Sequence, residues 1–436
     1  MTRGKLDAPV VLGSARAEHI ESMIGQLAEL SEGGPGVTRL AYSPLERRAH
    51  ALFAQWMSDL GCSVSTDAAG NTIAERPGAV PGRPAIGVGS HLDSVYSGGR
   101  FDGIAGVVAG VELVRLLAEA GMTLEHPLRI VAFAGEEGAR FGQACVGSKL
   151  AAGLTARHVL DELTDRSGTS LSAAMREIGL DPDSAAAQGW DADDWAVFLE
   201  LHIEQGKVLE NSGAAVGPVD LISGSTRLSF VMTGRPSHTG GTPMLNRSDA
   251  LAAAAEAVLI AETLASDDTH RGTRATVGRL SVEPNSITTI PGRVTFSLDV
   301  RDIDADRQRR AVTEIVGRVM ATCRRRKVTL EVNLIADTSP VVMPLWVRQA
   351  LVAGAKELDV PYRVLGSGAS HDAQMINTFV PTALLFVPSR DGLSHVPDEW
   401  TEFAQVATGV DVLARAVIGL DKSMTASERV ASKEEL

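Results

Sequence analysis

Two short apolar runs in the first third of the chain each end beside glycine and a group that can ligate or transfer protons. Ala85 to Val88 is followed by Gly89-Ser90-His91, and Leu128 to Phe133 is followed closely by Gly135-Glu136-Glu137. Residues 103–120, between the two runs, have the small apolar composition of a buried helix. Strand, helix and strand with polar residues at the strand ends is typical of an α/β sheet whose site lies at the carboxyl edge. The sequence therefore predicts an α/β fold with such a site.

A different pattern occupies residues 220–337. We expect, in order, a strand, a helix, two strands, a helix and a strand at 225–233, 248–264, 275–282, 294–301, 305–325 and 328–335. This order is typical of a small α+β module of ferredoxin-like type. A length of 436 residues also favours more than one domain. We predict a mixed-sheet catalytic domain from residues 1–219 and 338–436, with residues 220–337 inserted as a separate domain. Further helices are expected at 15–30, 44–60 and 344–357, and further strands at 63–66, 72–74 and 383–387.

The charge of the chain narrows the class of ligand. Lys and Arg number 41 and Asp and Glu 54, a formal net charge of −13. So acidic a chain is not expected to neutralise nucleic-acid phosphates or anionic lipid. We therefore expect a small-molecule substrate, with neither nucleic acid nor membrane as partner.

Cysteine usage and the N-terminus bear on the compartment. Cys62, Cys145 and Cys323 are widely separated and odd in number, so they form neither a disulfide framework nor a CxxC metal site. The N-terminus lacks the apolar core of a secretory signal, and no stretch approaches the roughly 18 consecutive apolar residues of a membrane span. We expect a cytoplasmic protein.

Two loops after the predicted strands carry candidate ligands. His91, Asp93 and, beyond a Gly-Gly turn, Asp102 place donors of the metal-ligand type on one loop. A strand-end turn with capping carboxylates is the alternative. Glu136 and Glu137 follow the next strand, and if that strand is central they cannot both be solvated. One of them then binds a metal or has a raised pKa, whereas an isolated Glu-Glu pair usually lies on the surface.

Two later segments add donors. Glu200, His202 and Glu204 alternate with apolar residues and so share one face of an extended segment, although an exposed charged face fits Glu204 equally well. His395 lies in a loop and is uninformative alone. The combined set of nitrogen and oxygen donors suits one or two divalent ions of zinc type, with a bridging carboxylate if there are two. Its members are His91, Asp102, Glu137, His202 and His395. Zinc, manganese and cobalt all fit such a set.

Six segments occur in a fixed order between Ser90 and Glu399: GSHLDSVYSGGRFDG, FAGEEGARFG, ELHIEQG, GRPSHTGGTPMLNRSDAL, SGASHDAQ and GLSHVPDE. In these segments the chain resembles the M20 family of binuclear metallohydrolases. Within that family it is similar to the branch of N-carbamoyl-L-amino-acid hydrolases and allantoate amidohydrolases. The resemblance covers some 310 residues.

The resemblance implies roles for the metal donors. Asp102 would bridge two divalent ions, with His91 and His202 as terminal ligands. Glu137 and His395 would complete the shells. The same resemblance makes Glu136 the general base and acid, and makes Asp93 the residue that orients His91.

The resemblance also implies a substrate site and a homodimer. The inserted domain would serve as lid and dimerisation domain, and His238 would stabilise the oxyanion, from its own or the partner subunit. Arg301 would pair with the substrate carboxylate. Other residues expected near the substrate are Arg227, Gln205, Gly368, Ala369 and His371. From the residues alone, a salt bridge of Arg301 with Asp299 or Asp302 is favoured over a substrate clamp, and His238 is expected to be exposed. His371-Asp372 could equally be a helix cap.

One position departs from the family pattern. Thr288 stands where these enzymes usually have an asparagine that donates to the substrate. Either Asn285 takes that role or the polar head group of the substrate differs. The expected activity is hydrolysis of the ureido C–N bond of N-carbamoyl-L-amino acids to amino acid, ammonia and carbon dioxide. The alternatives are an allantoate or related ureide hydrolase, a dipeptidase or deacylase, and an inactive binding homologue.

Overall fold

The computed structural model describes residues 12–434, and side chains through residue 426. Residues 1–11, on which most of the expectation about a secretory signal rests, lie outside that range. The chain divides into two compact units. The first comprises Met1–Asp220, Met343–Ser367 and His371–Leu436, and the second comprises Leu221–Val342 and Gly368–Ser370.

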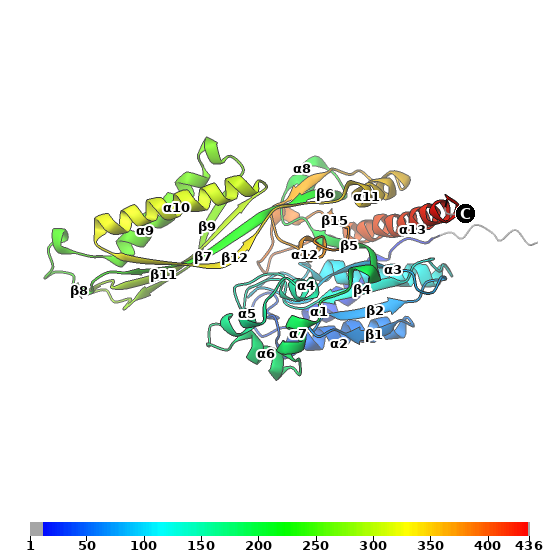
Figure 1. Cartoon of the computed structure of the whole chain (residues 1–436), viewed down its shortest axis with the longest axis horizontal. Helices are drawn as coiled ribbons and strands as arrows, with labels where there is room; N and C mark the ends of the chain where they lie inside the picture. Colours follow the sequence, from blue (N-terminus) through cyan, green and yellow to red (C-terminus); the bar gives the residue numbers. More distant parts are fainter. Residues whose placement is uncertain (1–11, 435–436) are drawn as a thin grey trace, which may run out of the picture. The chain divides into compact units, whose positions relative to one another are not determined.

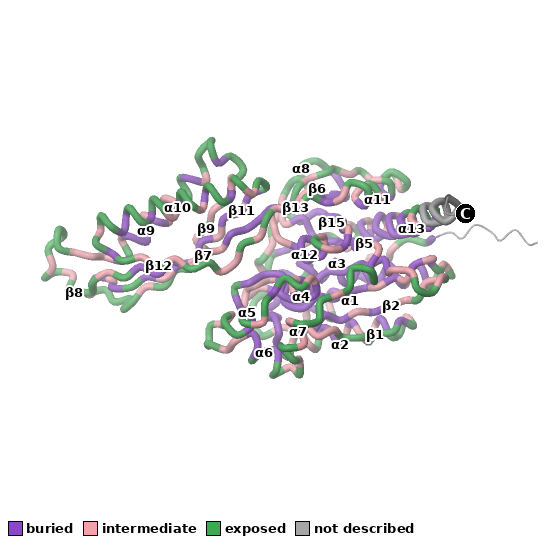
Figure 2. The backbone as a smooth tube through the Cα atoms, viewed as in Figure 1, coloured by how far each residue is buried: buried purple, intermediate pink, exposed green. Residues whose placement is uncertain are grey.

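The first unit is built on a mixed sheet with the strand order β1-β2-β4-β3-β5-β15-β6-β13, and β14 pairs with β6. Its strands are β1 Ser63–Thr66, β2 Thr72–Arg76, β3 Ala85–His91, β4 Leu128–Phe133, β5 Trp195–Ile203, β6 Gly217–Ile222, β13 Val341–Val342, β14 Leu365–Ser367 and β15 Thr382–Val387. Strands β4, β3, β5 and β15 run parallel, and antiparallel strands flank them. The central strands β3, β5 and β15 are almost wholly buried (Figure 2). Continuous burial explains why β3 and β15 read as unbroken apolar runs.

Helices cover this sheet and complete the core of the first unit. The longer ones are α1 Ala17–Ala28, α2 Pro44–Asp59, α3 Ile104–Glu119, α11 Leu345–Glu357 and α13 Phe403–Glu434. The shorter ones are α4 Val146–Ala151, α5 Arg157–Glu162, α6 Leu171–Glu177, α7 Pro182–Ala187, α8 Val208–Ser212 and α12 Asp372–Ile376. Helix α3 lies directly on the sheet, because a Cβ on Gly106 would come 2.2 Å from the carbonyl oxygen of Leu201. This close approach sets the start of α3 beside the ends of β3 and β5.

Helix α13 is not among the predicted elements. Its segment Phe403–Ala426 has the length and hydropathy of a membrane span, but 61% of the apolar window is buried inside the protein. Side chains such as Val410, Leu413 and Val417 belong to the core of the first unit. The buried helix of a protein core meets the same criteria of length and composition as a membrane span, so these criteria alone are weak evidence for a span at α13.

The second unit has the predicted order of strand, helix, two strands, helix and strand. These elements are β7 Gly224–Thr233, α9 Ala250–Ala265, β9 Arg274–Glu283, β11 Arg293–Asp302, α10 Ala305–Arg326 and β12 Thr329–Thr338. The four strands form an antiparallel sheet in the order β12-β7-β11-β9, and α9 and α10 pack on one of its faces (Figure 1). A separate two-stranded ribbon joins β8 Ser237–His238 to β10 Thr289–Ile290. The predicted α/β class with a mixed sheet is therefore confirmed.

Candidate metal centre

The carboxyl ends of two parallel strands bring the first three donors together. His91 ends β3 and His202 lies one residue before the end of β5, and the register that pairs Val88 with Leu199 sets these ends side by side. One ligand atom from each of His91, His202 and Asp102 lies within 4.8 Å of the others. The Oδ1 atom of Asp102 is 3.1 Å from Nε2 of His202 and 3.6 Å from Nε2 of His91. We call these three buried residues the strand-held group.

A second group shares Asp102 and is built from loops. Asp102, Glu137 and His395 also have ligand atoms within 4.8 Å of one another. Nε2 of His395 lies 3.1 Å from Oε2 of Glu137 and 3.3 Å from Oδ2 of Asp102. The two carboxylate oxygens of Asp102 therefore face different groups. We call Asp102, Glu137 and His395 the loop-held group.

The electrostatics of both groups favour bound positive charge. Burial lowers the pKa of His202, but the charge of Asp102, its hydrogen bond to the ring and the charge of Glu200 together outweigh burial and raise that pKa to about 9. The charge of Glu137 raises the pKa of His395 to about 11, against the opposing effect of burial. Burial and the charge of Asp102 raise the pKa of Glu137 to about 7. Imidazole nitrogens and carboxylate oxygens that attract protons so strongly are the donor set that divalent ions of zinc type prefer. The residues present therefore fit a metal centre.

Asp93 connects His91 with the loop that carries Glu136 and Glu137. Its Oδ1 atom lies 3.4 Å from Nδ1 of His91, the ring nitrogen remote from Asp102. The same carboxylate accepts hydrogen bonds from the backbone N–H of Glu136 at 2.8 Å and of Glu137 at 3.0 Å. Asp93 is wholly buried, so this contact orients the imidazole of His91 and the loop together.

Glu136 faces the strand-held group. Its Oε2 atom lies 3.8 Å from Nε2 of His91, and its Oε1 atom accepts a hydrogen bond from the Cys145 thiol at 3.0 Å. The residue is 6% exposed. Its carboxylate is thus placed beside the donors, where a proton-transfer group would be needed.

Two side chains contact the shared carboxylate of Asp102. Nε2 of Gln205 and Oγ of Ser394 each donate to its Oδ2 atom at 2.6 Å. Gln205 has φ 56°, and its buried Oε1 atom has no hydrogen-bond partner among the described residues. The amide of Gln205 therefore lies at the metal centre and keeps one free acceptor.

His371 and Glu200 lie against His202. The rings of His371 and His202 are 4.5 Å apart in an edge arrangement, and Glu200, His202 and His371 form a third group of buried donors. The carboxylate of Glu200 already accepts hydrogen bonds from Ser90 Oγ and from the backbone N–H of Ala373. His371 occupies the N-cap position of α12 without a side-chain cap bond. It is thus buried beside His202 and at a helix start.

The second unit gathers the predicted arginines. Nε and Nη2 of Arg301 are each 3.1 Å from Oδ2 of Asp299, and its Nη1 donates to the carbonyl oxygen of Gly368 at 3.0 Å. Nε of Arg227 lies 3.7 Å from the same carboxylate oxygen. Of the two salt bridges that the sequence left open for Arg301, the structure has the one with Asp299. Ala369 follows Gly368 in the same short segment of this unit.

His238 is exposed in the ribbon of the second unit. Its Nδ1 atom accepts hydrogen bonds from the backbone N–H of Gly240 at 3.1 Å and of Gly241 at 3.0 Å. Since Nδ1 accepts, a neutral ring carries its hydrogen on Nε2. Thr288 lies alongside, because its carbonyl oxygen accepts from the N–H of Thr239. Asn285 is exposed with φ 53°.

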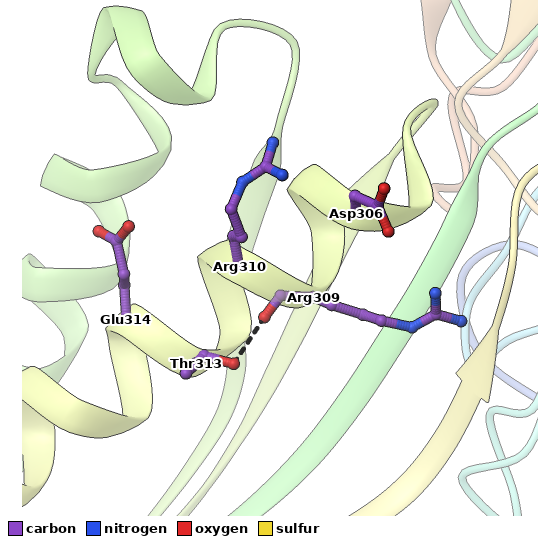
Figure 3. Close-up of a pocket in the computed structure, with 5 residues that line it drawn as sticks. All are labelled: Asp306, Arg309, Arg310, Thr313 and Glu314. Atoms are coloured by element: carbon purple, nitrogen blue, oxygen red, sulfur yellow. Dashed lines mark hydrogen bonds between the residues drawn. The ribbon is translucent and has the colours of Figure 1, made fainter.

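A hollow of about 360 Å³ on the second unit is not part of this centre. Its lining residues all project from α10, and the one hydrogen bond drawn there joins Thr313 Oγ1 to the carbonyl oxygen of Arg309 (Figure 3). The lining residues are Asp306, Arg309, Arg310, Thr313 and Glu314. Charges of both signs along one exposed helix define no ligand chemistry.

Several residues at the centre are absent from the sequence prediction. Ser394 and Glu399 flank His395 in GLSHVPDE, and this proximity was the only signal for them. Cys145 contacts Glu136 from a buried position, and no motif indicates that contact. Glu200 lies beside His202, as the alternation of that segment predicts.

A mixed α/β sheet that carries two imidazole–carboxylate groups joined by one carboxylate has the architecture of a metal-dependent hydrolase. Comparison with known proteins agrees. The model of peptidase family M20/M25/M40 matches residues 87–418, so the chain belongs to this family of hydrolases acting on C–N bonds. The resemblance inferred from the six sequence segments is confirmed.

Named relatives match nearly the whole chain. An N-carbamoyl-L-amino-acid amidohydrolase of Paenarthrobacter aurescens is 39% identical over 413 residues, which are 95% of this chain and 100% of that protein. One of Geobacillus stearothermophilus is 41% identical, covering 91% and 97%. An allantoate amidohydrolase of Bacillus subtilis is 35% identical, covering 87% and 91%. The crystal structure of an amidase of the hydantoinase/carbamoylase family from Burkholderia vietnamiensis has a TM-score of 0.88 and 31% identity, covering 95% and 99%.

Proposed function

We propose that this protein hydrolyses the ureido C–N bond of N-carbamoyl-L-amino acids and releases the amino acid, ammonia and carbon dioxide. The observation that carries the proposal is the sharing of Asp102 between two groups of metal donors. Relatives at 39% and 41% identity that bear this activity in their names support the choice of substrate.

Two divalent ions are proposed, zinc first, with manganese and cobalt as alternatives. His91 and His202 would hold one ion, Glu137 and His395 the other, and Asp102 both. Such a pair supplies an activated water at neutral pH and polarises the carbonyl group.

The residues around the donors would manage protons and orientation. The Glu136 carboxylate, 3.8 Å from the His91 ring, would take a proton from the attacking water and return it to the departing nitrogen. Asp93 would hold the His91 ring and, through the N–H groups of Glu136 and Glu137, the base loop. Gln205 would turn its free amide oxygen toward a substrate N–H.

The second unit would bind the carboxylate and oxyanion of the substrate. Arg301 would exchange Asp299 for the substrate carboxylate, with Arg227 adding positive charge nearby. His238 would donate its Nε2–H to the developing oxyanion in the partner subunit of a homodimer that these inserted domains form. Asn285, Thr288, Gly368, Ala369 and His371 are proposed as further residues close to the substrate.

The proposal also includes the domain boundaries and the cellular compartment. Residues 1–219 and 338–436 would form the catalytic domain, and residues 220–337 the lid and dimerisation domain. A cytoplasmic location is supported by the three buried, free cysteines, which suit a reducing compartment.

The test is a substrate panel assayed with zinc, manganese and cobalt in turn. Hydrolysis of carbamoyl-amino acids, with no action on allantoate, ureidoglycolate or dipeptides, is the expected result. Equal action on allantoate would favour the second candidate, which the Bacillus subtilis relative and Thr288 support. Fewer than one equivalent of metal after reconstitution would instead indicate an inactive binding homologue.

A further inference from the structure

The carboxylate of Glu399 lies between the two loops that carry Asp102 and His395. Its Oε1 atom accepts hydrogen bonds from the backbone N–H of Phe101 at 2.9 Å and of Asp102 at 3.1 Å. Its Oε2 atom accepts from the Ser394 hydroxyl at 2.8 Å and from the N–H of His395 at 3.4 Å. Glu399 is 2% exposed, so no solvent competes for these bonds. One buried side chain thus connects the backbones of two proposed metal donors.

The backbone of His395 depends on support of this kind. Its φ is 61°, in the left-handed region that a residue with a side chain rarely adopts without compensating contacts. Glu399 accepts from its N–H, and the N–H of Glu399 donates to the carbonyl oxygen of Val396 at 3.1 Å and closes the turn. The turn aims the imidazole at Asp102 and Glu137.

The side chain of Glu399 packs closely against the backbone of Gly99. A Cβ on Gly99 would lie 2.0 Å from Oε1 of Glu399 and 2.4 Å from its Cβ, so only glycine allows this approach. Beside the contact, the ring of Phe101 packs edge-on against Trp400 at 5.3 Å. The Gly98-Gly99 turn noted in the sequence therefore admits the Glu399 side chain.

We propose that Glu399 is a positioning residue for the loop-held group, acting through the backbone of His395 and anchored on the loop of Asp102. This inference rests on the proposed function. The sheet register of β3 and β5 fixes His91 and His202 without Glu399. Loss of Glu399 should therefore weaken the ion held by Glu137 and His395 far more than the ion held on the strands.

A residue that only stabilised the fold would behave differently, because it would lower thermal stability without distinguishing the two ions. Asp421 provides the matched control. Asp421 is 5% exposed, and its carboxylate accepts hydrogen bonds from the backbone N–H of Glu125 at 3.1 Å and of His126 at 2.9 Å and lies 2.8 Å from Nδ1 of the His126 ring. It joins two segments of the first unit, as Glu399 does, but contacts neither donor group.

The experiment titrates metal-free, full-length protein with Co²⁺ and follows heat and absorbance for wild type, Glu399→Ala, Glu399→Gln and Asp421→Ala. Wild type and Asp421→Ala should bind two ions. Glu399→Ala should bind one ion as wild type does and the other 10- to 100-fold more weakly, the usual range for such supporting partners. Glu399→Gln retains one acceptor oxygen and should show a smaller loss at the same ion, which keeps the test available if the alanine variant does not fold.

A double-mutant cycle with His395→Ala tests whether Glu399 acts on the metal ion through His395. If Glu399 acts through His395, Glu399→Ala should add less than threefold to the loss that His395→Ala already causes at this ion. Additive losses, equal weakening of both ions, or wild-type affinities in both Glu399 variants would each overturn the inference while wild type still binds two ions. A wild-type protein that binds fewer than two ions would instead overturn the proposed function, and this inference with it.

Discussion

The strand-held and loop-held groups share a carboxylate but are built in opposite ways. The side chains of His91 and His202 are 2% exposed at the ends of adjacent strands, whereas the side chain of His395 is 49% exposed in a left-handed turn. Sheet hydrogen bonds fix the first pair of donors. The third depends on a few specific contacts, among them those of Glu399. The comparison teaches that one centre can combine a group of donors fixed by the sheet with a group whose geometry can be changed by substitutions in its loops.

The largest expected effect is that of a substitution at Glu136, which should slow catalysis while both donor groups keep their metal ions. Glu136→Gln removes the proton-transfer group but keeps its size, so kcat should fall by about 10²- to 10⁴-fold. Metal content, measured by elemental analysis, should stay at the wild-type value. Loss of metal would show that Glu136 and Glu137 have been assigned in the wrong order.

An exposed loop residue of the second unit should affect rate alone. His238→Ala removes a donor to the oxyanion, and we expect kcat to fall by roughly 10²-fold with metal content and thermal stability unchanged. Steady-state kinetics beside metal analysis make the measurement. An unchanged kcat would remove His238 from the oxyanion site.

Stability should distinguish the two groups directly. In metal-free protein near pH 7, His202→Ala leaves Asp102 buried without its partner, which costs about 3 kcal/mol of unfolding free energy. His395→Ala leaves the buried Glu137 without its imidazole partner, but this carboxyl group has a pKa of about 7 and can take up a proton, so the cost should be smaller, about 1 kcal/mol. Urea denaturation of both variants tests this. Equal costs would mean that the loop-held group is as rigid as the strand-held group.

The smallest effect is on pH dependence. Imidazole donors must be neutral to bind metal, and the pKa values of about 9 for His202 and about 11 for His395 mean that both are protonated at pH 7 in metal-free protein. Each ion should therefore release protons, and affinity should rise about tenfold per pH unit per proton. Calorimetry in buffers of different ionisation enthalpy measures the release, and binding without proton release would contradict the prediction.

The strand-held donors could be predicted because local patterns mark them. His91 follows an apolar run directly, and the alternation around His202 identifies both the strand and the face that carries the imidazole. The contact of Glu399 with the Asp102 loop spans 297 residues, so no local pattern contains it. The order of strands and helices in the second unit could also be predicted, because each of its elements has its own periodicity.

Helix α13 was missed because packing overrides its local sequence. Gly409 and Gly419 lie inside it and lower helix propensity. A Cβ on Gly409 would come 2.6 Å from Val387 and 2.7 Å from Leu201, so this glycine lets the helix approach the central strands. The close packing of Gly409 against the sheet therefore compensates for its low helix propensity, and a local sequence pattern cannot show such packing.

The position of β15 in the sheet sets the order in which the chain can mature during synthesis. Strand β15, Thr382–Val387, lies between β5 and β6 although it follows both in the chain. The ribosome therefore synthesises the whole second unit before the sheet of the first unit can be completed. His395 emerges later still, so the nascent chain cannot bring all five proposed metal donors together until both the second unit and β15 have been synthesised.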